Sequence, residues 1–224
     1  MILSGGGDSH NFKKLDQYFL SLMPSSPNLL LIPLAGNPES YGDCLERIVE
    51  TFSSIHFENI ELCLEISDLH WDYLRHFDAI YIDGGNTFQL MNQIRNSHFY
   101  ELLHRFLHHG GIINGDSAGA VIFGAHIETA HFGLEGDENS VELVSYQGLN
   151  LLDNLAIHCH YHGKDDDDEI KAFVKAYGFE VLALPESSGV SISNGILHVH
   201  TKTSAFYFYQ DQKIAIKQGF ELAL

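Results

Sequence analysis

The sequence predicts an α/β fold in which a mostly parallel sheet is flanked by helices and C-terminal antiparallel hairpins close one edge. Two observations carry this prediction. Short apolar segments alternate with amphipathic ones from residue 29 to residue 184, which is typical of parallel strands buried between helices. Around residue 195 the pattern changes to alternating residues on both sides of an Asn-Gly pair, the signal of a tight hairpin. We therefore expect ligands to bind at the carboxyl ends of the parallel strands.

Each expected element follows from its own local pattern. Apolar runs predict strands at residues 29–34, 60–66, 79–82, 155–159 and 180–184, and a further strand that ends at residue 114. Helical periodicity predicts helices at residues 41–53, 87–108 and 165–177, and a short apolar helix at 118–124. Hairpins are expected at residues 190–200 and 205–216. Because no segment has the composition of a linker, we expect residues 1–224 to form a single catalytic domain.

Composition and charge exclude several classes of function. The 12 Lys and Arg residues face 30 Asp and Glu residues, so the formal net charge is −18, which repels nucleic acid and anionic membrane surfaces. No stretch approaches the roughly 20 apolar residues of a membrane-spanning helix. Three scattered cysteines form no disulfide framework and suit a reducing compartment. We expect a cytoplasmic protein without a cofactor, whose exposed C-terminal strands leave room for a homodimer.

The segment from Gly115 to Gly119 has the form G-x-S-x-G and stands between an expected strand and an expected helix. On such a nucleophile elbow, small flanking residues permit a strained turn that exposes the serine oxygen above the edge of the sheet. The pattern therefore indicates Ser117 as a catalytic nucleophile. The alternative is an ordinary tight turn with a capping serine.

Two glycine-rich segments could bring backbone amides close to a ligand. Gly84-Gly85 follows the expected strand at 79–82, so it lies at the sheet edge where Ser117 should emerge, and a second run extends from Ser4 to Asp8. A phosphate-binding loop is the rival interpretation. Neither segment has the G-x-G-x-x-G or phosphate-loop lysine pattern, which argues against nucleotide binding.

Three histidines, His158, His160 and His162, occupy alternating positions directly after the apolar residues 155–157 of the expected strand at 155–159. If the chain stays extended they share one face, so a zinc site is one interpretation. A general base for Ser117 is the other, and we favour it because a serine elbow needs one histidine and no metal. The residues alone leave the orienting acid open; the candidates are Asp137, Glu138 and Glu186.

Four short motifs occur together in this order: residues 84–90 (GGNTFQL), 117–120 (SAGA), 184–186 (LPE) and 193–195 (SNG). With these motifs the chain resembles dipeptidase E and its cyanophycinase-related relatives, serine peptidases with a three-layer fold similar to class I glutamine amidotransferases. The resemblance implies that Ser117 is the nucleophile, His160 the base, and the amides of Gly85 and Ala118 the oxyanion hole. It places the acid between nucleophile and histidine, where Asp137 is our choice and Glu138 the near alternative. It also implies hydrolysis of short peptides with a free N-terminus, notably after aspartate.

The chain departs from this family after its histidine. Where dipeptidase E has basic residues that hold the substrate carboxylate, this sequence has four consecutive aspartates at 165–168, which we expect to begin a solvated helix. An acidic rim would favour an ammonium group or a basic side chain over an N-terminal aspartate. Two further functions remain as rivals: an esterase or amidase with the same residues, and a catalytically silent binding or regulatory protein.

Overall fold

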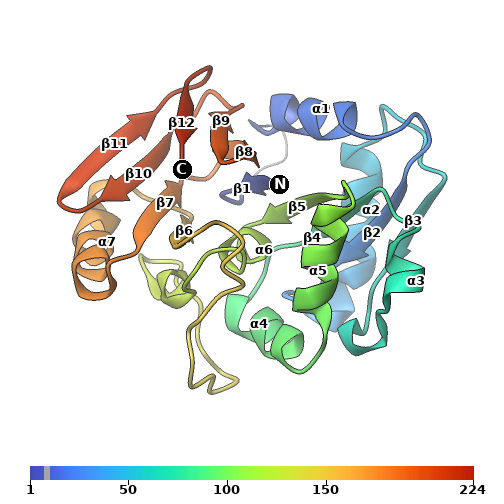
Figure 1. The fold of residues 1–224 in the computed structure, drawn as a ribbon, viewed down its shortest axis with the longest axis horizontal. Coiled ribbons are helices and arrows are strands. Elements are labelled where there is room, and N and C mark those ends of the chain that lie inside the picture. The colour runs from blue at the N-terminus through green and yellow to red at the C-terminus, as the bar shows by residue number, and fades with distance from the viewer. Residues whose placement is uncertain (8–10) are drawn as a thin grey trace.

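The computed structural model describes residues 1–7 and 11–224, and its largest element is an eight-stranded sheet (Figure 1). From one edge to the other the strands are β12 (Glu221–Ala223), β9 (Ile196–Val199), β8 (Gly189–Ser193), β1 (Ile2–Ser4), β5 (Ile112–Asp116), β4 (Ala79–Ile82), β2 (Asn28–Ile32) and β3 (Asn59–Leu62). The neighbouring strands β1, β5, β4, β2 and β3 pair in parallel in this order. Strands β8, β9 and β12 continue the sheet antiparallel beyond β1. This half of the molecule has the predicted architecture.

A second sheet of four strands contains the histidine segment. Its order is β11 (Gln212–Ile216), β10 (Ala205–Tyr209), β7 (Glu180–Leu184) and β6 (Leu155–Cys159). Strands β6 and β7 are parallel, and β10 and β11 form an antiparallel hairpin beside β7. The second hairpin therefore closes this smaller sheet and does not extend the edge formed by the first hairpin.

Helices cover both faces of the large sheet (Figure 1). Helices α1 (Lys13–Ser21) and α2 (Tyr41–Thr51) pack on the face that carries Ile2, Leu29, Leu31 and Tyr81. Helices α4 (Thr87–Arg95) and α5 (Phe99–His108) pack on the opposite face, which carries Leu30, Ile80 and Ile113. The two core clusters thus follow the alternation of side chains along each strand. The remaining helices are α3 (Trp71–Leu74), α6 (Ala118–Val121) and α7 (Lys164–Tyr177) with the 3₁₀ turns Pro38–Ser40, Ile66–Asp68 and Glu128–His131.

The structure corrects the sequence prediction in a few places. The helix expected at 87–108 is two helices, because the Ser97 hydroxyl bonds the carbonyl of Ile94 and accepts the amide of Phe99, which ends α4 and begins α5. Strand β1 and helix α1 were not predicted; β1 has three residues, too few for a periodic pattern. In the part of the chain that the structure describes, no helix is long and apolar enough to span a bilayer.

Candidate active site

Ser117 lies on a strained turn between β5 and α6. Its backbone has φ 47° and ψ −113°, a region that non-glycine residues occupy only where the surrounding structure enforces it. The two glycines of the motif make this turn possible. A Cβ on Gly115 would lie 2.4 Å from the carbonyl oxygen of Gly119, and one on Gly119 would lie 2.2 Å from that of Ile82. The sequence around Ser117 thus forms the geometry of a nucleophile elbow.

The imidazole of His160 faces the Ser117 hydroxyl. Ser117 Oγ lies 2.7 Å from His160 Nε2, a hydrogen-bonding distance at which the imidazole can accept the hydroxyl proton. His160 follows β6 and has a positive φ of 53°, so the chain turns sharply at this residue. Its amide donates to the carbonyl of Gly5 at 3.1 Å. Backbone strain and a hydrogen bond to Gly5, the residue after β1, thus fix the position of the imidazole.

Two carboxylates lie beside the other ring nitrogen of His160. Glu186 Oε1 is 3.1 Å from Nδ1, and Glu135 Oε2 is 3.4 Å from the same atom. Both glutamates are about half exposed, with side-chain exposures of 50% and 55%. Glu186 follows β7, the strand beside β6, and therefore approaches the histidine across the small sheet. Glu135 comes from the loop between β5 and β6, where the sequence had suggested its neighbours Asp137 and Glu138.

Asp137 and Glu138 contact the glycine loop after β4. Asp137 Oδ2 accepts the amide of Thr87 at 2.8 Å, and the Glu138 carbonyl accepts the side-chain amide of Asn86 at 2.9 Å. Burial raises the pKa of Asp137 above its ordinary value. Among the described hydrogen bonds, none joins either carboxylate to His160. Their contacts hold the loop that contains Gly85.

Gly85 and Ala118 border the same small cavity as Ser117 and His160. Gly85 has a positive φ of 138°, and a Cβ there would lie 2.2 Å from the carbonyl oxygen of Ala35. This close approach is stabilised by the amide of Asn86, which donates to the same carbonyl at 2.7 Å. Within the described residues the amides of Gly85 and Ala118 donate no hydrogen bond, so both are available to a ligand in this cavity.

The three alternating histidines do not gather around one point. His158 is buried, with Nδ1 at 3.0 Å from the carbonyl of Thr129 and Nε2 at 3.1 Å from Asp166 Oδ2. Asp166 also accepts the amide of His162 at 2.7 Å. A different set, Glu135, His160 and Glu186, places its ligand atoms within 4.8 Å of one another and is compact enough to hold a metal ion. That set includes the imidazole that faces Ser117.

The aspartates at 165–168 do not form the solvated rim that we expected. Asp166 is 1% exposed and is bonded to His158, and Asp167 bonds the Tyr161 hydroxyl and Lys213. Asp165 and Asp168 remain exposed. Asp166 and Asp167 therefore hold α7 against the small sheet through these hydrogen bonds, because carboxylates withdrawn from water need hydrogen-bonding partners.

The first glycine run lies against His160 and Glu186. A Cβ on Gly6 would lie 2.4 Å from His160 Cε1, and one on Gly7 would lie 3.1 Å from Glu186 Cβ. The Gly6 carbonyl accepts the amide of Ser187 at 3.2 Å. Asp8, which completed this run in the phosphate-loop alternative, lies outside the described residues. The sequence analysis identified these glycines as a possible ligand-binding loop. Their contacts with His160 and Glu186 depend on strand β1, which was not predicted.

Comparisons with known proteins show what the chain is similar to. The model of "Peptidase family S51" matches residues 1–200. A peptidase E of Shewanella sp. (strain W3-18-1) is 25% identical over 97% of this chain and 93% of its own length. An uncharacterized peptidase of Listeria monocytogenes (strain EGD-e) is 30% identical over 72% of this chain and 78% of its own length. The crystal structure of a peptidase from an acI-B1 Actinobacterium shares the fold, with a TM-score of 0.77 at 16% identity, covering 100% of this chain and 96% of that one.

Proposed function

Because the chain belongs to peptidase family S51, we propose that it hydrolyses short peptides with a free N-terminus through Ser117, His160 and Glu186. The observation that carries this proposal is the distance of 2.7 Å between Ser117 Oγ and His160 Nε2, at a turn whose glycines permit a positive φ. A serine that merely capped a helix would need neither the strain nor the histidine. The curated relatives named peptidase E support a peptide substrate.

The geometry supports a two-step acyl transfer. Ser117 Oγ attacks the peptide carbonyl while His160 Nε2 takes the hydroxyl proton. The carbonyl oxygen becomes an oxyanion that the amides of Gly85 and Ala118 can bind, and such preorganised donors contribute on the order of 3 kcal/mol each. His160 then gives its proton to the departing amine. In the second step His160 activates a water that hydrolyses the acyl-enzyme and restores Ser117.

Glu186 is our choice for the acid that orients His160. It lies closer to Nδ1 than Glu135 does, at 3.1 Å against 3.4 Å. A carboxylate at Nδ1 holds the ring in the tautomer that leaves Nε2 free to accept a proton, and it stabilises the imidazolium that forms. Asp137 and Glu138 act instead on the loop of Gly85 through Thr87 and Asn86. In this proposal they position the oxyanion hole.

The test is hydrolysis of a dipeptide panel with varied first residues by the native protein and by Ser117→Ala. We expect the native protein to cleave some members and the variant to lose at least about a thousandfold in kcat, as when other serine nucleophiles are removed. Ser54→Ala, at an exposed serine of the surface, is the matched control and should keep full activity.

The same panel separates the rival functions. Turnover of aryl esters without turnover of any peptide would replace the peptidase with an esterase. Equal peptide turnover by native and Ser117→Ala protein would remove Ser117 from the mechanism. Absence of both activities, together with saturable peptide binding, would favour a binding protein that kept the fold.

A further inference from the structure

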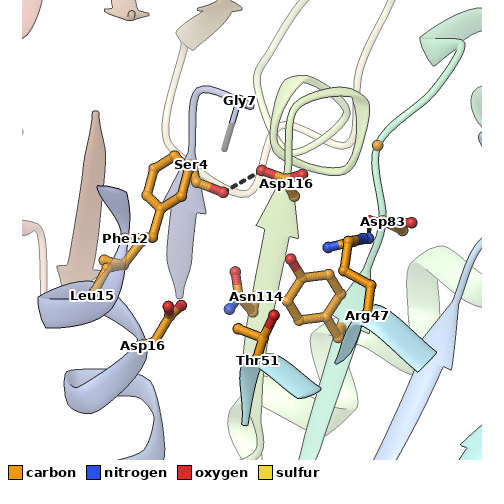
Figure 2. A pocket seen from close by; sticks show the side chains of 12 residues that line it. Ser4, Gly7, Phe12, Leu15, Asp16, Arg47, Thr51, Asp83, Asn114 and Asp116 are labelled. Atoms are coloured by element: carbon orange, nitrogen blue, oxygen red, sulfur yellow. Dashed lines mark hydrogen bonds and ion pairs between the residues drawn. The ribbon is translucent and has the colours of Figure 1, made fainter. Parts of the chain in front are cut away.

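A second cavity, of about 460 Å³, is lined in part by Gly84, and Figure 2 shows the side chains around it. It opens between β1, β5 and β4 on one side and helices α1 and α2 on the other. A Cβ on Gly84 would lie 3.2 Å from Ser117 Cβ and 3.6 Å from Asp116 Oδ2. The cavity therefore adjoins the residue before the nucleophile, and its volume falls in the range of about 300–1,000 Å³ typical of ligand pockets.

The charged side chains of this cavity have an excess of negative charge. Its described lining contains three aspartates, Asp16, Asp83 and Asp116, and one cation, Arg47. Arg47 is committed to Asp83, with Nη2 at 2.5 Å from Oδ1. Burial and the charge of Asp116 raise the pKa of Asp16 to about 7. Two carboxylates thus share this cavity without a lysine or arginine of the described chain paired to them.

The side chain of a buried asparagine, Asn114, also lines this space. Asn114 is 3% exposed, and its Oδ1 has no hydrogen-bond partner among the described residues. Asn114 and Asp116 are two positions apart on β5, so both side chains lie on the face covered by α1 and α2. Figure 2 shows the Asn114 side chain among those around the cavity, between Asp16 and Arg47 in this view. A buried acceptor without a donor costs free energy unless a ligand supplies the donor.

The remaining wall is apolar. Phe12 and Leu15 of the α1 region are buried and border the cavity beside Asp16 (Figure 2). An apolar wall that leads to carboxylate and amide oxygens matches a cation carried on an aliphatic stem, because the stem packs on carbon while the head group donates to oxygen. A carboxylate or phosphate would be repelled by the same lining.

We propose that this cavity binds the ammonium or guanidinium group of a basic side chain, carried by the residue whose carbonyl Ser117 attacks. The substrate class becomes short peptides with a lysine-like or arginine-like residue at the cleaved position. This proposal rests on the proposed peptidase function. The same cation chemistry could also come from a free alkylamine, and the tests below distinguish the two sources.

The first test compares peptides that differ only in the charged head group. We expect the native protein to cleave after lysine with a kcat/KM at least tenfold higher than after norleucine, which has the same aliphatic stem without the ammonium. Asp16→Asn should reduce this ratio at least fivefold. Asp43→Asn, an equal charge change at an exposed position outside the cavity, should leave the ratio unchanged. Equal rates after lysine and norleucine, or a ratio that Asp16→Asn does not move, would overturn the proposal.

The second test needs no catalysis and therefore separates this proposal from the peptidase function. Binding of n-pentylammonium to Ser117→Ala protein is measured by calorimetry. We expect saturable binding that Asp16→Asn weakens at least fivefold and that Asp16→Lys, which places an ammonium group of the protein itself in the cavity, abolishes. Thermal unfolding of each variant checks that the fold is intact. Failure of the amine to bind, or binding that is indifferent to both substitutions, would refute the cation site.

The combination of results identifies the source of the cation. If n-pentylammonium competes with lysyl peptides, the cavity is a subsite for the substrate side chain, as proposed. If the amine binds but no peptide is cleaved, the peptidase function fails while the cation site stands. If it binds and changes turnover without competing, the site stands as a site for a free amine, and its assignment to the substrate side chain is wrong.

Discussion

The two residues that would exchange a proton both have a strained backbone. Ser117 has φ 47° and His160 has φ 53°. Each such residue costs on the order of 1–3 kcal/mol, and the cost is tolerated only where neighbours leave the chain no alternative. Here the neighbours are glycines, at positions 115 and 119 beside the serine and at position 6 beside the histidine. The conformation of the site therefore requires glycine, which has no side chain, at these positions.

If Glu186 is the acid that orients His160, its substitution should lower kcat more than substitution of Glu135. We expect Glu186→Gln to lower kcat at least a hundredfold, because the amide no longer stabilises the imidazolium of His160. Glu135→Gln should have a smaller effect, because its oxygen is farther from Nδ1. The measurement is kcat on the best dipeptide of the panel. Glu138→Gln is the control, because Glu138 contacts the loop of Gly85 through its backbone carbonyl, which this substitution keeps. A larger loss for Asp137→Asn than for Glu186→Gln, with unchanged binding of a substrate-like inhibitor, would transfer the role to Asp137.

Gly6 provides a test of how the histidine is held. Gly6→Ala should abolish most activity, because its Cβ would lie 2.4 Å from His160 Cε1 and must displace the ring. Gly110→Ala is a matched control: its φ is also 85°, but no atom lies within 4 Å of the added Cβ. Both variants carry the same backbone penalty of about 1 kcal/mol, measured as a loss of unfolding free energy. Equal activity in the two variants would show that the contact with His160 does not position the base.

At the scale of elements, the small sheet brings His160 and Glu186 to Ser117. His160 follows β6 and Glu186 follows β7, and these strands are parallel neighbours with Cys159 opposite Leu184. Their carboxyl ends therefore point the same way and reach Ser117 from the second sheet. Helix α7 covers this sheet through the buried pair of His158 and Asp166. A substitution that breaks this pair should make the position of His160 less well defined, although neither residue of the pair contacts its imidazole.

The pair of His158 and Asp166 should contribute stability that depends on pH. Burial alone would raise the pKa of Asp166, but hydrogen bonds from His158 and the His162 amide outweigh it and lower the pKa. Asp166→Asn should therefore reduce the unfolding free energy by about 2 kcal/mol near neutral pH. A carboxylate whose pKa is lower in the folded protein contributes its full stabilisation at pH values above its pKa in the unfolded chain, and this contribution is lost as the pH falls through its folded-state pKa. The difference in unfolding free energy between Asp166→Asn and native protein should therefore shrink below about pH 4.

Chemical denaturation between about pH 3 and pH 7 measures this difference. Asp165→Asn, at an exposed position one residue earlier in the same helical turn, is the control and should stay within about 0.5 kcal/mol of native protein. A deficit for Asp166→Asn that is constant with pH would mean that the ionised carboxylate is not what stabilises α7.

The sequence was sufficient to predict those elements that depend only on residues close together in the chain. The elbow at Ser117, the Asn-Gly hairpin and the parallel strands β2, β4 and β5 each depend on neighbouring residues, and the structure contains all of them. The partners of His160 could not be ranked in the same way. Glu186 lies 26 residues from His160 along the chain, and their contact exists only because β6 and β7 pair. The cavity beside Gly84 also depends on α1, which has no clear signal in the sequence.

At the scale of the whole molecule, the dominant feature is the net charge of −18. So large an excess of carboxylates repels itself in the compact state and destabilises it. We expect NaCl between about 20 and 300 mM to raise Tm by about 2–4 °C, because salt shortens the range over which exposed charges interact. Choline chloride at equal ionic strength should have the same effect if screening is the cause. A Tm that falls with salt, or that responds to sodium alone, would contradict it.

Strand β1 has a consequence for how the chain is made. Its three residues precede β5 and β8 in the chain, yet they lie between these strands, which end at residues 116 and 193. The large sheet therefore cannot become continuous until residue 193 has been synthesised, and contacts over such separations form slowly. During elongation β2, β4 and β5 can assemble, but β5 keeps one open edge beside the nucleophile turn. The nascent protein should depend on chaperones until β8 emerges and the N-terminal strand is enclosed.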